Sequence, residues 1–102
     1  MSRIVYYTLV YPSIPVGSSW TIKKTLPEGT IIKGIFLETT HRYQAEVQDV
    51  RNQQGLGTLA SKVNLINGYR FSNKLGTDID VLVTNLDTIA INPLVIIETE
   101  VM

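Results

Sequence analysis

The chain contains no cysteine, a single histidine and few charged residues. Without cysteine it forms neither disulfides nor zinc–thiolate centres, and it has no thiol nucleophile. Charged residues make up 18% of the chain, against about 25% in typical soluble domains. Such a low share leaves apolar surface to be explained, and packing into an oligomer or a larger assembly explains it.

The chain also lacks an excess of either charge, since nine basic and nine acidic side chains balance. Binding to nucleic acid or to an anionic membrane surface requires basic residues in excess or gathered on one face. We therefore expect neither partner. A net charge near zero lowers colloidal stability, which again suits a protein that works inside an assembly.

Long apolar segments are missing as well. The first four residues, Met-Ser-Arg-Ile, lack the basic region and apolar run of a signal peptide. No apolar run approaches the length of about 18 residues that a transmembrane helix needs. We expect a soluble protein without signal peptide or transmembrane segment, and its length fits one domain over residues 1–102.

Valine, isoleucine and threonine are abundant, at roughly a third of the chain, and these branched side chains favour strands over helices. Alternating patterns separated by turn residues predict strands at residues 3–11, 19–26, 30–40, 43–50, 77–84, 88–91 and 94–101. For residues 56–71 we expect an irregular loop with at most one short helix or strand, and a tight turn at Asn67-Gly68. The fold class is all-β, a single small antiparallel β-sandwich, jelly-roll-like, with about seven or eight strands.

The stretch Leu26–Thr40, with the sequence LPEGTIIKGIFLETT, is the most informative part of the chain. Pro27-Glu28-Gly29 predicts a turn with glycine in the left-handed region. Gly34 weakens the following strand unless a bulge or a close neighbour requires it. The run from Ile31 to Leu37 is apolar on both faces, as is the strand at residues 3–11, and a domain this small buries two such strands with difficulty. At least one of them is therefore expected at a subunit interface, with these candidate residues: Ile31, Ile35, Phe36, Leu37, Tyr7 and Tyr11.

The strand at residues 19–26 is expected to turn Trp20 and Ile22 inward and Thr21, Lys23 and Thr25 toward water. An alternative function follows if Trp20 and neighbouring tyrosines are exposed instead, because aromatic rings stack on sugars and other ligands. The chain is then a carbohydrate- or ligand-binding β-module with Trp20 at its site.

Catalytic and metal-binding patterns are weak. His41 is the only histidine, and no serine lies in a nucleophile-elbow context. Asp78 and Asp80 share one strand face, and clustered carboxylates can bind Ca²⁺, but we interpret them as charges on a solvated strand face. We expect no enzyme, no catalytic residue, no metal site and no cofactor.

The strand–turn–strand segment from Trp20 to Thr40 resembles small jelly-roll-like β-sandwich structural proteins of phages and other viruses. In these a strand ends in a Pro-x-Gly turn and continues into an Ile-x-Gly-Ile segment, here Ile32-Lys33-Gly34-Ile35. The resemblance implies a capsid, decoration or fibre component of a virion. Such a component acts by self-association, contacts other virion proteins and has no catalytic residues.

Overall fold

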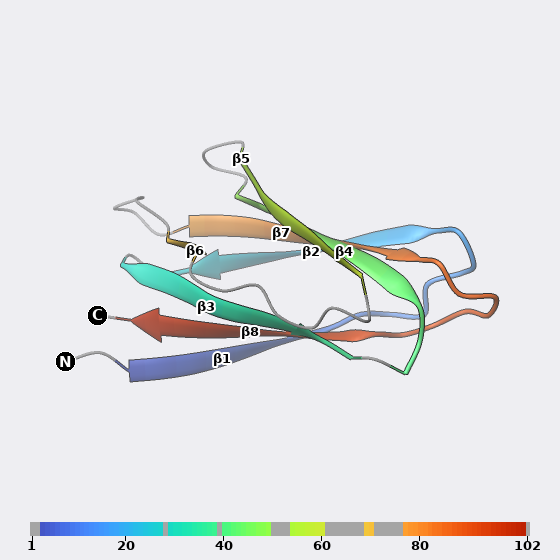
Figure 1. Ribbon diagram of the computed structural model, residues 1–102, viewed down its shortest axis with the longest axis horizontal. Coiled ribbons are helices and arrows are strands. Elements are labelled where there is room, and N and C mark those ends of the chain that lie inside the picture. The colour runs from blue at the N-terminus through green and yellow to red at the C-terminus, as the bar shows by residue number, and fades with distance from the viewer. Residues whose placement is uncertain are drawn as a thin grey trace.

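A computed structural model describes residues 3–27, 29–38, 40–49, 54–60, 69–70 and 77–101 (Figure 1). The side chains described are those of residues 3–27, 29–38, 40–48 and 78–101. The strands are β1 (Arg3–Val10), β2 (Ser19–Leu26), β3 (Thr30–Leu37), β4 (Tyr43–Asp49), β5 (Gln54–Ala60), β6 (Tyr69–Arg70), β7 (Thr77–Asn85) and β8 (Leu94–Val101). The described part of the chain holds no helix, so the all-β prediction is confirmed.

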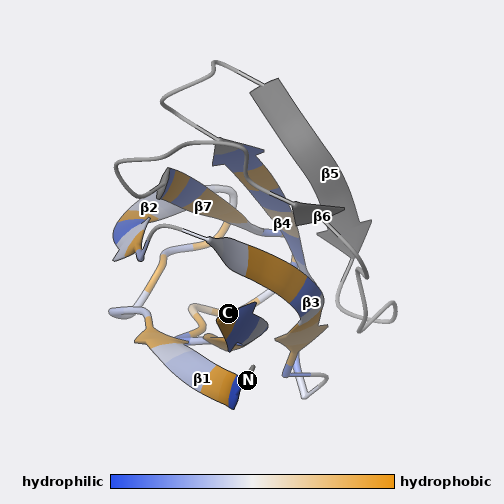
Figure 2. Ribbon diagram, turned by 90° about the vertical axis from the view of Figure 1, so that its left-hand side faces the viewer, coloured by the Kyte–Doolittle hydropathy of each residue, from blue (hydrophilic) through white to orange (hydrophobic). Residues whose placement is uncertain are grey.

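The strands form two four-stranded antiparallel sheets, ordered β1-β8-β3-β6 and β2-β7-β4-β5. The first and last strands lie side by side, in unbroken register from Arg3 opposite Val101 to Val10 opposite Leu94. Figure 2 shows the two sheets as separate layers, with β1 and β2 at the same side of the molecule. Each of these two strands is an edge of its sheet.

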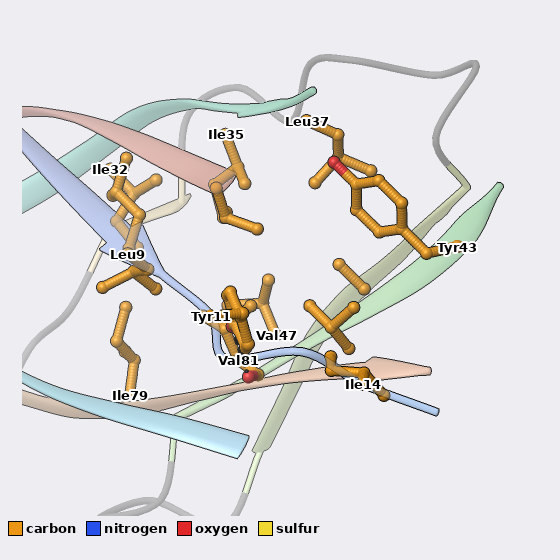
Figure 3. Packing of buried hydrophobic residues seen from close by; sticks show 14 of the residues in the cluster. Leu9, Tyr11, Ile14, Ile32, Ile35, Leu37, Tyr43, Val47, Ile79 and Val81 are labelled. Atoms are coloured by element: carbon orange, nitrogen blue, oxygen red, sulfur yellow. Dashed lines mark hydrogen bonds between the residues drawn. The ribbon is translucent and has the colours of Figure 1, made fainter. Parts of the chain in front are cut away.

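The core fills the space between the sheets (Figure 3). Side chains two residues apart on each strand enter it, as the period of a pleated strand requires. The sheet of β1, β8 and β3 contributes buried residues Leu9, Ile32, Ile35, Leu37, Val95 and Ile97. The sheet of β2, β7 and β4 contributes Leu26, Tyr43, Ala45, Val47, Ile79, Val81 and Val83.

A β-bulge in β3 interrupts this alternation. The pairing of β3 with β8 shifts between Ile32 and Gly34, so that Lys33 has no opposite residue. The extra residue turns both Ile32 and Ile35 inward, although three positions separate them. A bulge, one of the two explanations that the sequence left open for Gly34, lies beside this residue. Gly29 adopts the left-handed conformation predicted for the turn, with φ of 80°.

Two parts of the predicted strand pattern were wrong. In the segment 56–71 the structure has two strands, β5 and β6, because ladder hydrogen bonds to β4 and β3 outweigh the low strand propensity of glycine. At residues 88–91 no strand forms, and only Ile91 makes an isolated bridge, to Ile14. There the Asp87 carboxylate accepts the backbone N–H of Thr88 and competes with strand pairing. The predicted turn at Asn67-Gly68 lies outside the described residues.

The loops β1–β2 and β7–β8 meet at the end of the molecule opposite the termini (Figure 1). Asn85 joins them: its buried amide donates to the carbonyls of Ile14, at 2.9 Å, and Ile89, at 2.8 Å. Its side-chain oxygen accepts the backbone N–H of Asp87 at 2.7 Å. One side chain thus fixes two loops to the end of β7.

Replacing Asn85 with alanine is expected to lower the free energy of unfolding by about 2–4 kcal/mol, because buried carbonyl and N–H groups lose their partners. Urea denaturation followed by circular dichroism measures the change. Asn92→Ala is the matched control, since Asn92 is exposed. A loss for Asn85→Ala no greater than that of the control would contradict the role of this side chain.

Candidate interaction surface

The outer face of the β1-β8-β3 sheet carries most of the exposed apolar side chains that lie on strands. Strand alternation places them opposite the core: the inner neighbours on β1 and β8 are buried or half-buried, and the outer ones are exposed. We define the apolar outer face by Ile4, Tyr6, Val10, Phe36, Leu94 and Ile96. Val10 is 67% exposed and Tyr6 59% exposed, both on the edge strand β1.

The residues of the apolar outer face form cross-strand rows. Thr8 on β1 lies opposite Ile96 on β8, and Ile96 lies opposite Phe36 on β3. Val10 lies opposite Leu94 in the next row. Directly opposite residues of antiparallel strands are about 5 Å apart at Cβ, so these side chains are in mutual reach. In these two rows Val10, Leu94, Ile96 and Phe36 form an apolar surface across three adjacent strands, whereas Tyr6 and Ile4 lie opposite Glu98 and Glu100 on β8.

Carboxylates border this surface toward the chain termini. Glu98 and Glu100 point outward from β8, and the Tyr6 hydroxyl donates to Glu98 Oε2 at 2.8 Å. The hydrogen bond to this carboxylate, together with its negative charge, raises the pKa of the Tyr6 phenol above its usual value. The outer face of this sheet therefore carries carboxylates at the end near the chain termini and apolar side chains at the opposite end.

The outer face of the opposite sheet is hydrophilic. The hydroxyls of Ser19 and Thr84 are 2.8 Å apart, and Thr25 donates to Asp78 at 2.9 Å. Lys23 lies opposite Asp80 in the same sheet. Apart from the half-buried Leu82, the described outward side chains of β2, β7 and β4 are polar. The two layers share one core but differ in what they show to the solvent.

Three of the predicted interface residues lie in the core of the chain itself. Ile35 is 0% exposed, Tyr11 2% and Leu37 5%. This part of the interface prediction was wrong because the bulge at Lys33 moves Ile35 and Leu37 to the inner face. Tyr11 lies beyond the end of β1, where its hydroxyl donates to the carbonyl of Val81 at 2.7 Å and burial raises the pKa of its phenol.

The other candidates lie elsewhere. Phe36 and Ile31 point outward from β3 and are half-buried, so Phe36 belongs to the apolar outer face. Tyr7 points inward and packs against the core. The ammonium of Lys24 lies 4.7 Å from the centre of the Tyr7 ring, within the range of a cation–π contact. An interface role for Ile31 and Phe36 stays a prediction.

Trp20 differs from the expectation for the strand at residues 19–26. Thr21, Lys23 and Thr25 are exposed and Ile22 is half-buried, as predicted. Trp20 shares the inward parity of Ile22, but β2 is an edge strand, and 52% of the Trp20 surface remains exposed. The ring is therefore accessible at the side of the molecule where β2 ends its sheet.

His41 and the aspartates form no cluster suited to chemistry among the described residues. His41 Nδ1 lies 3.7 Å from Asp87 Oδ2 in the loops at one end of the molecule. The backbone N–H groups of Arg42 and Thr88 lower the pKa of Asp87 below its usual value. Within the described ranges, no group of three potential metal ligands occurs. The same residues include no helix of a length and hydropathy suited to crossing a bilayer.

No protein-family model matches the chain, and no curated protein sequence matches it. Its fold is similar to that of a chain in the capsid asymmetric unit of cyanophage Pam1, with a TM-score of 0.53 and 15% identity over 97% of this chain and 82% of that one. The core of Drosophila NLP, described for pentamer formation and histone binding, aligns with a TM-score of 0.49 and 15% identity over 96% and 99% of the two chains. At this identity the likeness to the phage chain is one of fold.

Sequence reasoning missed Ile4, Tyr6, Val10, Leu94 and Ile96 as surface residues. The sequence of β1 does indicate exposed apolar residues, because both faces of this strand are apolar. In β8 the pattern is less clear, because Ile96 shares a face with two glutamates. Only the strand order brings β1, β8 and β3 together and joins their outer residues into one surface.

Adjacent residues of β3 provide a test of this arrangement. Ile35→Lys buries an unpaired ammonium in the core and is expected to lower the free energy of unfolding by more than about 4 kcal/mol, most of the stability of a domain near the lower end of the roughly 5–15 kcal/mol range. Phe36→Lys places the same charge on the outer face and is expected to leave the chain folded. Circular dichroism and thermal melting compare the two proteins. If Phe36→Lys unfolds the chain as Ile35→Lys does, then Phe36 is a core residue and the outer face is misassigned.

Proposed function

We propose that this chain is a non-enzymatic structural protein of a virion, a capsid, decoration or fibre component that acts by self-association. The apolar outer face carries the proposal. An antiparallel sheet with one solvated face normally shows polar residues there, as the β2-β7-β4 sheet does. Exposed apolar patches of this kind mark interaction sites in soluble proteins. A second copy of the chain, or another virion protein, is the partner that the proposal assigns to this face.

The strand order supports a jelly-roll β-sandwich as the finer description of the fold. Pairing joins the outermost strands in sequence, β1 with β8 and β2 with β7, and then the innermost, β3 with β6 and β4 with β5. A long antiparallel ribbon that is rolled into two sheets gives this order, and double-sheet jelly rolls recur in viral capsid domains. The likeness in fold to the cyanophage capsid chain agrees with it.

Energetics indicates what kind of assembly suits this surface. Burial of the exposed halves of about five apolar side chains contributes on the order of 5 kcal/mol. Association itself costs roughly 4–15 kcal/mol in lost translational and rotational freedom. The apolar outer face alone therefore supports at most weak pairing. Stable assembly requires further contacts, either from neighbours in a shell or from strand edges.

The proposal assigns no catalytic residue. His41, the only histidine of the chain, lies beside Asp87. Asp78 accepts a hydrogen bond from the hydroxyl of Thr25. The carboxylates of Asp87 and Asp78 thus each hold together two segments of the fold. These contacts agree with a chain that works by binding.

Light scattering on the purified protein tests self-association. We expect a mass above that of the 11.4 kDa chain at micromolar concentration. Ile96→Lys is expected to lower the mass, because it charges the centre of the apolar outer face. Leu82→Lys is the matched control, since Leu82 points outward from the hydrophilic sheet. A monomer at all concentrations that binds no capsid or fibre would overturn the proposal.

A second candidate function, a carbohydrate- or ligand-binding module, has one observation in its favour, the half-exposed ring of Trp20. Because Trp20 is the only tryptophan, fluorescence emission reports on that site alone. If the module binds glycans, titration with a glycan panel will shift or quench this emission in a saturable way. Trp20→Ala will abolish binding measured by calorimetry. Unchanged emission across the panel counts against this function.

A further inference from the structure

The free edge of β1 lacks the features that keep edge strands from pairing with other chains. β1 is the edge of its sheet, and all eight of its residues pair with β8 without a bulge. Its sequence, RIVYYTLV, has no proline, no glycine and no charge beyond Arg3 at one end. Edge strands of monomeric proteins are usually short, bulged, charged or interrupted by proline. A long, regular and apolar edge is instead a template for another strand.

The other edges of the two sheets carry such protection. β2 has two adjacent lysines. Lys23 is exposed to solvent, and the ammonium of Lys24 lies over the Tyr7 ring. β6 is only two residues long. β5 contains two glycines, and its pairing with β4 shifts between Val47 and Gln48. Among the described strands, β1 is thus the edge that remains open to a partner.

The hydrogen bonds of β1 show which of its groups face outward. The carbonyl of Val5 accepts from the side-chain hydroxyl of Thr99 on β8, and the backbone N–H of Tyr11 donates to the carbonyl of Pro93 just before β8. Residues of odd number therefore turn their backbone groups toward β8. In an antiparallel ladder the N–H and C=O of one residue point the same way. The backbone groups of Ile4, Tyr6, Thr8 and Val10 consequently point away from β8, along the open edge.

We infer that two copies of this chain join through antiparallel pairing of their β1 edges, about a two-fold axis at Tyr7. The inference deepens the proposed self-association and rests on it. Antiparallel pairing places the two Arg3 side chains at opposite ends of the seam, whereas parallel pairing sets these like charges side by side. This charge arrangement favours a second copy in the antiparallel orientation as the occupant.

The register centred on Tyr7 uses the whole edge. Ile4 lies opposite Val10 of the partner subunit, and Tyr6 lies opposite Thr8 of the partner subunit, each in a hydrogen-bonded pair. The full overlap gives about eight backbone hydrogen bonds, two for each such pair. The side chains of these residues lie on the outer face, so the seam makes the apolar outer faces of two subunits continuous. Apolar cross-strand pairs of this kind stabilise sheets.

Thr8→Pro tests the pairing most directly. It removes an N–H that points along the open edge, and it leaves the ladder between β1 and β8 intact because Thr8 does not bond to β8. Thr8→Lys is a second variant that keeps the backbone N–H and places a charge on the outer face of β1, beside the seam. Thr21→Lys is the matched control, an exposed threonine on the protected edge strand β2. Sedimentation velocity gives the mass of each protein, and circular dichroism checks its folding.

We expect both Thr8 variants to lower the mass of the assembly by about twofold or more, and Thr21→Lys to leave it unchanged. If the unmodified protein is itself a monomer, the proposed self-association fails and this inference with it. If the unmodified protein is an oligomer and the folded Thr8 variants keep its mass, the β1 seam is overturned while self-association stands.

A single cysteine tests the register. The chain has no cysteine, so Tyr7→Cys carries one thiol. On the two-fold axis two such residues form a pair without backbone hydrogen bonds, with Cα atoms about 4.5 Å apart, a distance that a disulfide spans. Mild oxidation is expected to give a covalent dimer on a non-reducing gel, and Thr21→Cys is expected to stay a single chain. An oligomer of Tyr7→Cys without this crosslink would overturn the two-fold register.

Discussion

Side chains alternate between the two faces of a strand, and a two-layer protein buries one face of each sheet. On the described strands, this constraint decides which apolar side chains enter the core. On β7 and β4 it is obeyed simply, with Val81, Val83 and Val47 inside and, apart from Leu82, polar residues outside. On β1 and β8 many of the outer positions are also apolar, although two glutamates share the outer face of β8. Nothing within the described part of the chain covers them, so the same physics that builds the core leaves a second apolar surface behind.

The bulge at Lys33 shows how strongly a single residue acts under this constraint. Without it, Ile32 and Ile35 would point to opposite faces, and the core would lose one of them. With it, Ile32, Ile35 and Leu37 all enter the core. The outer face of β3 keeps Ile31, Lys33 and Phe36, a less apolar set than strict alternation predicts. Most of the apolar outer face therefore lies on β1 and β8, and β3 contributes only Phe36 to it.

The sequence predicts the fold class well because the information is local. Branched residues, period-two alternation and the Pro27–Gly29 turn suffice for β1, β2, β3, β4, β7 and β8 within a few residues. They do not suffice for β5 and β6. β5 pairs with β4, the strand before it, but its two glycines weaken the local signal, whereas β6 pairs with β3, which is distant in sequence. The interaction surface is poorly predicted because it too depends on pairing between strands that are distant in sequence. A run such as Ile31–Leu37 reads as apolar on both faces, and only the register with β8 shows that Ile35 is inside and Phe36 outside.

The apolar outer face and the open edge of β1 belong to one strand, and each supplies what the other lacks. Burial of an apolar face stabilises a contact between two subunits but does not fix their relative orientation, since its free energy depends on area alone. A strand edge gives register and orientation, but its hydrogen bonds exchange with water and contribute only about 1 kcal/mol each. Joined at β1, the edge fixes how two subunits meet, and the faces become one larger apolar surface. Specific association of protein surfaces requires about 800 Å² on each side, and the joined faces of two subunits come closer to this area than the face of a single subunit does.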